Sequence, residues 1–283
     1  MRRHELTDAA WVRIEPFLPG QVRRGGRWLD HRTVLNGILW KLATGAPWRD
    51  LPERYGNWKT VYERYRRWAA DGTFDQVLTC VQVHDDAIGR IDWTVSIDST
   101  IVRAHQHAAG ARKKREPAGT NRQALGRSRG GLTSKLHLAV DGRGLPLALA
   151  VTAGNVNDCT VFDQIMIDIR VPRPGRGRPR TRPDRVIADK AYSSRAVRAH
   201  LRTRGIGCTI PERSDQRAGR SRRASRGGRP PAFDPAAYRQ RNVVERCINR
   251  LKQWRGIATR YDKLARHYRA AVTLVSALLW ITT

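Results

Sequence analysis

Apolar side chains recur at helical spacing in three stretches of the first 70 residues. Thr7 is placed to cap the first helix, the second begins near Arg32 and ends at Gly45, and the third follows Gly56. The pattern predicts a small, all-helical unit at the start of the chain. In its third helix we expect Val61, Tyr65 and Trp68 to point inward, and Lys59, Arg64, Arg66 and Arg67 to lie on the other faces.

From about residue 91 the pattern changes to short β-branched and apolar runs that are separated by turns and helices. Three strands, a helix, a strand, a helix, a strand and a final helix predict a mixed sheet with helices packed on it, an α/β fold. We expect strands at 93–98, 132–141, 145–152, 186–189 and 206–210, and helices at 158–169, at 193–203 and from Asp234, with Pro235 at its first position, past Trp254.

Positive charge dominates the sequence, which has 54 Lys and Arg against 25 Asp and Glu, a formal net charge of +29. Three windows rich in Gly, Pro or Ser, at 111–129, 170–185 and 212–230, hold seven Lys or Arg each, and we expect them to be basic loops. Charge of this density indicates a polyanionic partner, with nucleic acid favoured over an anionic membrane surface. Solvated linkers are the alternative.

The basic third helix of the N-terminal unit is a candidate for DNA binding. Three short helices with a basic last member resemble a helix-turn-helix unit, whose last helix enters the major groove of DNA. Lys59, Arg64 and Arg67 are its candidate DNA contacts. A solvated basic face is the alternative reading of the same pattern.

The sequence points to a cytoplasmic, nucleoid-associated protein without a membrane span. No apolar run reaches the roughly 18 residues that a transmembrane helix needs, and charged residues at 2–5 argue against a signal peptide. The four cysteines lie far apart, with no Cys-x-x-Cys pair. Structural zinc and a disulfide framework are therefore not expected, in agreement with a reducing compartment.

Three acidic residues form the strongest candidate for chemistry. Asp98 and Asp189 each end a predicted strand, and Glu245 lies on the last predicted helix. Strand ends side by side can bring carboxylates within a few ångströms, where a divalent cation would neutralise them and clamp an in-line phosphoryl displacement. Any one such acid alone is more often a turn residue or an ion-pair partner.

One face of the last predicted helix carries Glu245 in line with three further functional groups. Tyr238, Arg241, Glu245 and Lys252 fall within an arc of about 60° at the helical 100° per residue. A solvent face with an i,i+4 ion pair from Arg241 to Glu245 explains the pattern equally well.

These residues resemble the signature of a known family. Tyr-x2-Arg-x3-Glu-x6-Lys, spelled by Tyr238, Arg241, Glu245 and Lys252, is similar to the motif of bacterial insertion-sequence DDE transposases of the numbered-four and numbered-five families. The boxes around Asp98 (Ser-Ile-Asp-Ser-Thr) and Asp189 (Ile-Ala-Asp-Lys-Ala-Tyr) resemble the other two acidic boxes. Residues 6–74 resemble the N-terminal domain of the numbered-five family, so the resemblance spans nearly the whole chain.

The resemblance implies a transposase that cuts at the terminal inverted repeats of an element and joins the ends to target DNA. It implies a ribonuclease-H-like catalytic domain at 91–283, preceded by a helical domain at 1–75 and a connector at 76–90. Asp98, Asp189 and Glu245 would hold Mg²⁺, as two ions with Mn²⁺ tolerated in its place, and Tyr238, Arg241 and Lys252 would bind phosphates. A homodimer or higher oligomer on double-stranded DNA is expected, because both ends must move together.

Four further residues near the acidic boxes are weaker candidates for DNA contacts. His105 and His107 form a His-x-His pair, but magnesium prefers oxygen ligands, so we expect a DNA-contacting or structural role. Lys135 and Lys190 are candidate phosphate contacts. Two other functions remain open from the sequence: a metal-dependent DNA nuclease that does not join ends, and a non-catalytic DNA-binding repressor of transposition.

Overall fold

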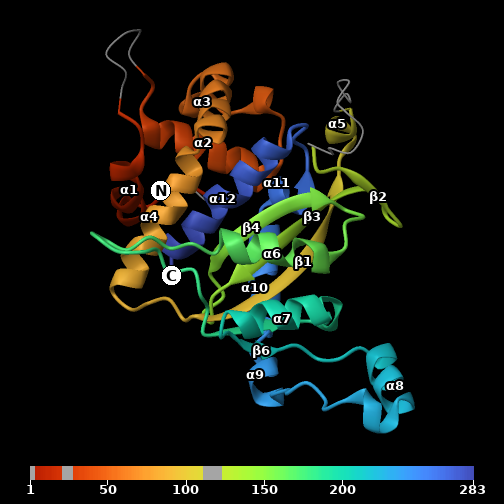
Figure 1. Cartoon of the computed structure of the whole chain (residues 1–283). Coiled ribbons are helices and arrows are strands. Elements are labelled where there is room, and N and C mark those ends of the chain that lie inside the picture. The colour runs from red at the N-terminus through yellow and green to blue at the C-terminus, as the bar shows by residue number, and fades with distance from the viewer. Residues whose placement is uncertain (1–3, 21–27, 111–122) are drawn as a thin grey trace.

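The computed structural model describes residues 4–20, 28–110 and 123–283 (Figure 1). Its centre is a mixed sheet in the order β4–β3–β1–β5–β6, in which β1, β3 and β4 are antiparallel and β5 and β6 run parallel to β1. This arrangement, together with the helices that precede it, confirms the predicted α/β fold with a ribonuclease-H-like mixed sheet. The strands are β1 (Thr94–Ala104), β2 (Gly126–Ser128), β3 (Gly131–Val140), β4 (Pro146–Ala153), β5 (Arg185–Ala188), β6 (Gly207–Thr209) and β7 (Thr259–Arg260).

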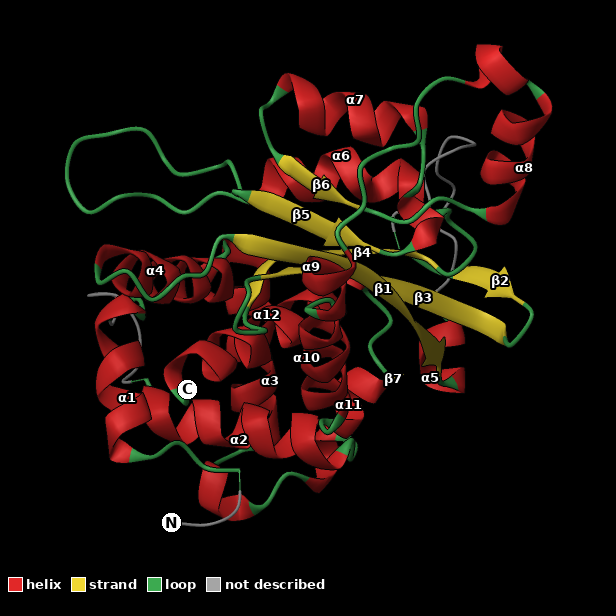
Figure 2. Cartoon of the chain, turned by 90° about the horizontal axis from the view of Figure 1, so that it is seen from below, coloured by secondary structure: helices red, strands yellow, loops and turns green. Residues whose placement is uncertain are grey.

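Helices cover both faces of the sheet (Figure 2). Helices α6 and α7 lie on one face, and α10, α12 and α4 lie on the other, where the remaining N-terminal helices pack outside them. The α-helices are α1 (Asp8–Ile14), α2 (His31–Thr44), α3 (Trp58–Asp71), α4 (Thr73–Ala87), α5 (Gln106–Ala109), α6 (Asp158–Asp168), α7 (Arg195–Thr203), α8 (Ser214–Arg222), α9 (Pro235–Arg239), α10 (Asn242–Lys252), α11 (Arg255–Ala258) and α12 (Ala265–Ile281). The 3-10 helices are η1 (Glu15–Phe17), η2 (Trp48–Asp50), η3 (Glu53–Tyr55), η4 (Lys190–Tyr192) and η5 (Ala224–Gly227).

The last helix, α12, joins the N-terminal helices to the sheet. It is apolar on almost every side and contacts α1, α3 and α4 as well as β4, as expected of a helix buried all round. The Tyr65 hydroxyl of α3 donates to the His267 carbonyl of α12, and the Trp280 indole donates to the Pro146 carbonyl of β4. One apolar cluster therefore runs from α1 to the sheet. The division of the chain at 1–75, 76–90 and 91–283 stays a prediction.

Two boundaries differ from the sequence prediction in ways that affect the site. Strand β1 does not end at Asp98, because its pairing with β3 continues from Ser96 opposite Val140 to Arg103 opposite Thr133. Asp98 is therefore an interior residue of the strand. In contrast, β5 ends at Ala188, one residue before the predicted end at Asp189, so Asp189 directly follows the strand.

The predicted long helix from Asp234 past Trp254 is in fact two helices. Asp234 caps α9, with Pro235 at its first position, as expected. The chain then turns through Gln240 and Arg241, where the backbone bonds span three residues instead of four, and α10 begins with its buried side chains against the sheet. Tyr238 is thus on a different helix from Glu245, and the arc that assumed one helix does not include it.

The basic windows are also less uniform than predicted. The window at 212–230 contains α8 and η5, which project from the body of the molecule (Figure 1). The window at 170–185 is a loop closed by a bridge between Val171 and Arg180, and β5 begins at its last residue. Residues 111–122 of the first window lie outside the described residues, and its remainder includes β2.

The turn between β3 and β4 is held by a buried acid. The Asp141 carboxylate accepts the backbone N–H groups of Arg143 (3.1 Å) and Leu145 (2.8 Å), and Gly144 takes the left-handed conformation that the turn requires (φ +82°). The other Asp141 oxygen is buried without a hydrogen-bond partner. Burial raises the pKa of Asp141 from 3.8 to about 6.

Replacement of Asp141 by Asn should remove a pH dependence of folding. Because the native pKa is the higher one, native protein holds more proton than unfolded protein between about pH 4 and pH 6. The free energy of unfolding of the wild type therefore falls as the pH rises through this window, and it stays lower above it. We expect the free energy of unfolding of the variant, relative to that of the wild type, to rise by about 1–3 kcal/mol between about pH 4 and pH 6. Urea titrations at a series of pH values measure this difference. Parallel curves would contradict the assignment.

Candidate active site

The parallel pairing of β1 with β5 brings two of the three predicted acids together. Ile97 is aligned with Ala188, so Asp98 and Asp189 occupy the next positions on neighbouring strands. Asp189 caps η4 by accepting the N–H of Ala191 (2.8 Å). Burial raises the pKa of Asp98, and the negative charge of Asp189 acts in the same direction.

Helix α10 adds the third acid through a shared cation. Nη1 of Arg241 donates to Oδ2 of Asp98 (2.9 Å), and Nη2 donates to Oε1 of Glu245. One guanidinium therefore joins a carboxylate of the sheet to a carboxylate of the helix. The positive charge of Arg241 lowers the pKa of Asp98 and so offsets part of the increase that burial causes.

The other two residues of the motif lie on either side of Arg241 and Glu245 in the chain, Tyr238 on α9 and Lys252 at the end of α10. Nζ of Lys252 donates to the Thr100 hydroxyl (2.7 Å) and the Ile101 carbonyl (3.2 Å) of β1. The Tyr238 ring is 5.9 Å from the Arg241 guanidinium, so the phenol stays beside the site although it belongs to α9. The two cations of the motif, Arg241 and Lys252, thus contact β1 between Asp98 and Ile101.

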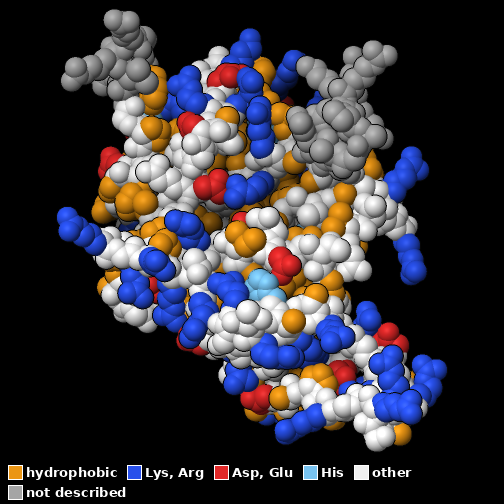
Figure 3. Space-filling model, viewed as in Figure 1, with side chains coloured by type: hydrophobic (Ala, Val, Ile, Leu, Met, Phe, Trp, Pro, Cys, Tyr) orange, Lys and Arg blue, Asp and Glu red, His pale blue; other side chains and the backbone are white. Residues whose placement is uncertain are grey.

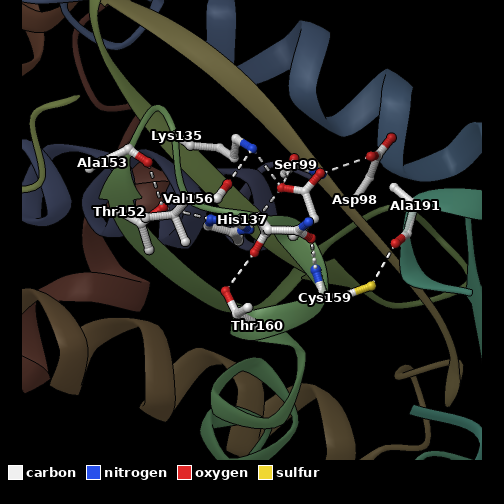
Figure 4. Close-up of polar contacts among 12 residues, drawn as sticks. Asp98, Ser99, Lys135, His137, Thr152, Ala153, Val156, Cys159, Thr160 and Ala191 are labelled. Carbon is white, nitrogen blue, oxygen red and sulfur yellow. Dashed lines mark hydrogen bonds and ion pairs between the residues drawn. The ribbon is translucent and has the colours of Figure 1, made fainter. Parts of the chain in front are cut away.

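A polar network behind Asp98 was missed by the sequence analysis (Figure 4). Asp158 accepts hydrogen bonds from the Ser99 hydroxyl and from Nζ of Lys135, both at 2.9 Å. Lys135 also donates to the Val156 carbonyl, at 2.7 Å. Asn157 caps α6, and Asp158, the first residue of that helix, ties it to β1 and β3.

Two neighbours complete this network. His137 is fully buried, its Nε2 is 2.8 Å from the Thr152 hydroxyl, and burial lowers its pKa to about 4, so the ring is neutral near pH 7. The Cys159 thiol donates to the Ala191 carbonyl (2.6 Å), which connects α6 to the turn that carries Asp189. The surroundings of both aspartates are therefore tied to one helix.

Two predicted DNA contacts are corrected by their surroundings. Arg64 is 6% exposed, lies 4.2 Å from the Trp28 ring, and places Nη1 at 2.8 Å from Nδ1 of His31. Its guanidinium points inward because the aromatic rings around it provide a cation–π site. The side chain of Lys135 is 12% exposed, and its ammonium is paired with Asp158. Neither cation is free to face DNA in this structure.

The remaining candidates keep positions near the surface. Lys59 and Arg67 are exposed on α3. His105 caps α5 and lies 5.0 Å from the Tyr261 ring, and His107 is exposed beside it. Lys190 begins η4, directly after Asp189, and is exposed.

The three acids suit a hard divalent cation in their chemistry, since each offers carboxylate oxygen. In the part of the chain that the structure describes, no group of three or more His, Cys, Asp or Glu side chains stands at metal-binding distance as it is. The Arg241 guanidinium lies between two of the three acids, Asp98 and Glu245. Within the same residues, no helix is both long and apolar enough to cross a membrane.

Two family models match the chain. Residues 6–78 match "Putative transposase of IS4/5 family", and residues 90–280 match "Transposase DDE domain". Among the curated proteins, a "Putative transposase for insertion sequence element IS6501" from Brucella ovis is 29% identical, over 53% of this chain and 99% of that protein. A "Putative transposase for insertion sequence element IS402" from Burkholderia cepacia is 35% identical, over 53% of this chain and 64% of that protein.

A third relative and the solved structures add less. The protein y4sN from Sinorhizobium fredii is 46% identical over 38% of this chain and 83% of that protein. The Mos1 transposase paired-end complex with left transposon end is 13% identical, over 92% of this chain and 80% of that chain, with a TM-score of 0.26. A TM-score this low supports no structural comparison.

Removal of the Asp158 carboxylate should destabilise the fold. In Asp158→Ala, the ammonium of Lys135 and the hydroxyl of Ser99 lose their partner in a largely buried place, which costs about 1–3 kcal/mol. Asp163→Ala on the same helix is the matched control, because that carboxylate is 71% exposed, and it should cost less than about 0.5 kcal/mol.

A double variant separates the free energy of the Lys135–Asp158 ion pair from the other effects of each substitution. Lys135→Met combined with Asp158→Ala leaves no ammonium without a partner, so its loss should be smaller than the sum of the single losses by about 0.5–3 kcal/mol. Urea unfolding of the four proteins measures this difference. Strictly additive losses would show that the pair does not act as a unit.

Proposed function

The chain belongs to the family of transposases with a DDE domain, and we propose that it acts on the terminal inverted repeats of its own insertion element. As a transposase it is an enzyme that cleaves DNA and transfers strands. The observation that supports the assignment of its site is the guanidinium of Arg241, which binds Asp98 and Glu245 together, beside the β1–β5 pairing that brings Asp189 next to Asp98.

DDE transposases depend on divalent metal, and we propose Mg²⁺ here, as two ions with Mn²⁺ tolerated. Asp98, Asp189 and Glu245 would hold the cations, which supply charge neutralisation at the phosphate and a more acidic attacking hydroxyl. The oxygen-only donor set supports this choice. It gives His105 and His107 no place as ligands.

The reaction has two steps at one site. Water first attacks the phosphorus at the end of the element, and the bond to the 3′-oxygen breaks, so that a 3′-hydroxyl is left on the element. That hydroxyl then attacks a phosphorus of the target DNA, a new phosphodiester forms, and the 3′-oxygen of the target strand leaves. Each step exchanges one P–O bond for another, so no external energy source is needed.

The motif residues outside the triad would hold the phosphates in line. Arg241 can bind a phosphate through two N–H groups, while Lys252 contributes a point charge on the same side of β1. Tyr238 is beside Arg241 and can stack on an unpaired end nucleotide. Their common location along β1 supports a phosphate path that leads to Asp98.

The wider basic surface would embrace the rest of the DNA. Lys and Arg side chains gather on one face over α7 and α8 (Figure 3). On these elements and in η5 the exposed residues include Arg195, Arg202, Arg217, Arg222 and Arg226. Their attraction to phosphate is independent of sequence and would keep the protein on the nucleoid between events.

At least two protomers would be needed for transposition. Each end of the element requires an active site, and both ends must join the target together. We therefore propose a homodimer or a higher oligomer that assembles on the two inverted repeats.

Replacement of Asp189 by Asn should abolish cleavage and strand transfer while sparing DNA-end binding. The amide oxygen can still accept the Ala191 N–H, so the turn is kept while a ligand charge is lost. The loss should exceed the roughly 10- to 100-fold that removal of an outer-shell partner costs. Cleavage of a labelled duplex carrying the inverted repeat measures it, with Asp163→Asn as the control. Cleavage at the native rate would refute the assignment of the triad.

Replacement of Lys59 and Arg67 by Ala should weaken binding to the element's ends. If each side chain neutralises one phosphate, the slope of log K against log salt should become shallower by about 0.9 per residue. Arg269→Ala, which removes an exposed cation that pairs with Asp75, is the control. Unchanged affinity at matched salt would remove α3 from the DNA interface.

A further inference from the structure

Arg241 serves two carboxylates that come from different elements. It lies at the junction of α9 and α10, and its side chain reaches Asp98 on β1 and Glu245 one turn further along α10. The side chains of Arg241 and Asp98 are 19% and 20% exposed, whereas that of Glu245 is 48% exposed. The bridge is therefore open to solvent on the Glu245 side.

The bridge and a bound cation need the same oxygen atoms. A carboxylate oxygen that accepts a hydrogen bond from a guanidinium cannot also point that lone pair at a metal ion. Like charges would also repel, since both occupants are cations. While it bridges Asp98 and Glu245, Arg241 therefore competes with a metal ion that both carboxylates would bind together.

Two neighbouring cations are already bound to other groups. Among the described residues, Lys252 is held by Thr100 and Ile101 further along β1, and Lys135 is held by Asp158 behind it. When Arg241 leaves, Asp98 and Asp189 remain side by side with less compensating charge. A site of this kind attracts a divalent cation more strongly than the bridged site does.

We propose that Arg241 is an exchangeable counter-ion, which holds Asp98 and Glu245 together in the free protein and moves to a DNA phosphate when the end of the element binds. This inference rests on the proposed function. Loss of the guanidinium to the phosphate frees both carboxylates for the cation, and a bound cation frees the guanidinium for the phosphate. DNA and metal therefore strengthen each other's binding, and by linkage they do so by the same factor.

The first test measures metal binding alone, with the full chain and Mn²⁺ in a calorimeter. Arg241→Gln should bind Mn²⁺ at least about fivefold more tightly than the wild type, because the competing cation is gone. Arg241→Lys keeps the charge but cannot bridge two carboxylates as a planar fork does, so its affinity should lie between the two. Arg246→Gln removes an exposed charge from the same helix and should leave the Mn²⁺ affinity unchanged.

The second test adds DNA without turnover. The probe is a duplex that ends at the inverted repeat flanking the gene, already cut and with a 3′-deoxy terminus. The wild type should bind Mn²⁺ at least about fivefold more tightly with this duplex than without it, and Arg241→Gln should lose most of that gain. Circular dichroism confirms that each variant is folded.

Two results would overturn the proposal: an Mn²⁺ affinity of Arg241→Gln equal to or weaker than that of the wild type, or a wild-type affinity that the duplex does not change. Neither measurement depends on cleavage. A failure of the Asp189→Asn prediction with intact coupling would reject the proposed catalytic role of Asp189. Loss of coupling with a cleavage-dead Asp189→Asn would instead reject the counter-ion role alone.

Discussion

The parallel pairing of β1 with β5 places Asp98 and Asp189 at adjacent positions, and the repulsion between these two carboxylates shapes everything around them. Because Asp98 is an interior residue of β1, it cannot turn away as a residue at a strand end could. A positive charge that offsets the two carboxylates comes from outside the sheet. Helix α10 provides it through Arg241, and the same helix brings a third carboxylate within reach of that cation.

The rigidity of the site depends on elements that carry no reactive group. Asp158 and Cys159 at the start of α6 connect β1, β3 and the turn after β5, so the two aspartates share one support. On the opposite face, α12 contacts α10 and β4 as well as the N-terminal helices α1, α3 and α4. A helix buried on all sides cannot shift without opening cavities in both layers. The carboxylates are thus held from two sides, whereas Arg241 is held only by its own hydrogen bonds.

The sequence predicted those features that depend on local chemistry. The Asp234–Pro235 start of α9 and the end of β5 before Asp189 follow from capping and strand patterns, which short segments express by themselves. The inward turn of Arg64, the continuation of β1 past Asp98 and the role of Asp158 depend instead on partners from distant segments. Trp28, β3 and Lys135 supply these partners, and no local pattern names them. The break between α9 and α10 also depends on distant segments, because α10 packs on β1 and β3 of the sheet.

Charge in this protein has two physical roles that differ in how much position matters. The net charge of +29 attracts any polyanion from a distance, and an arginine of α8 can replace another in that role. Arg241 cannot be replaced, since two carboxylates at fixed positions determine where its guanidinium lies. A basic surface gathers DNA, but a cation that the active site itself must release makes the chemistry respond to the correct DNA end. Specificity can thus arise from competition for oxygen atoms inside the site.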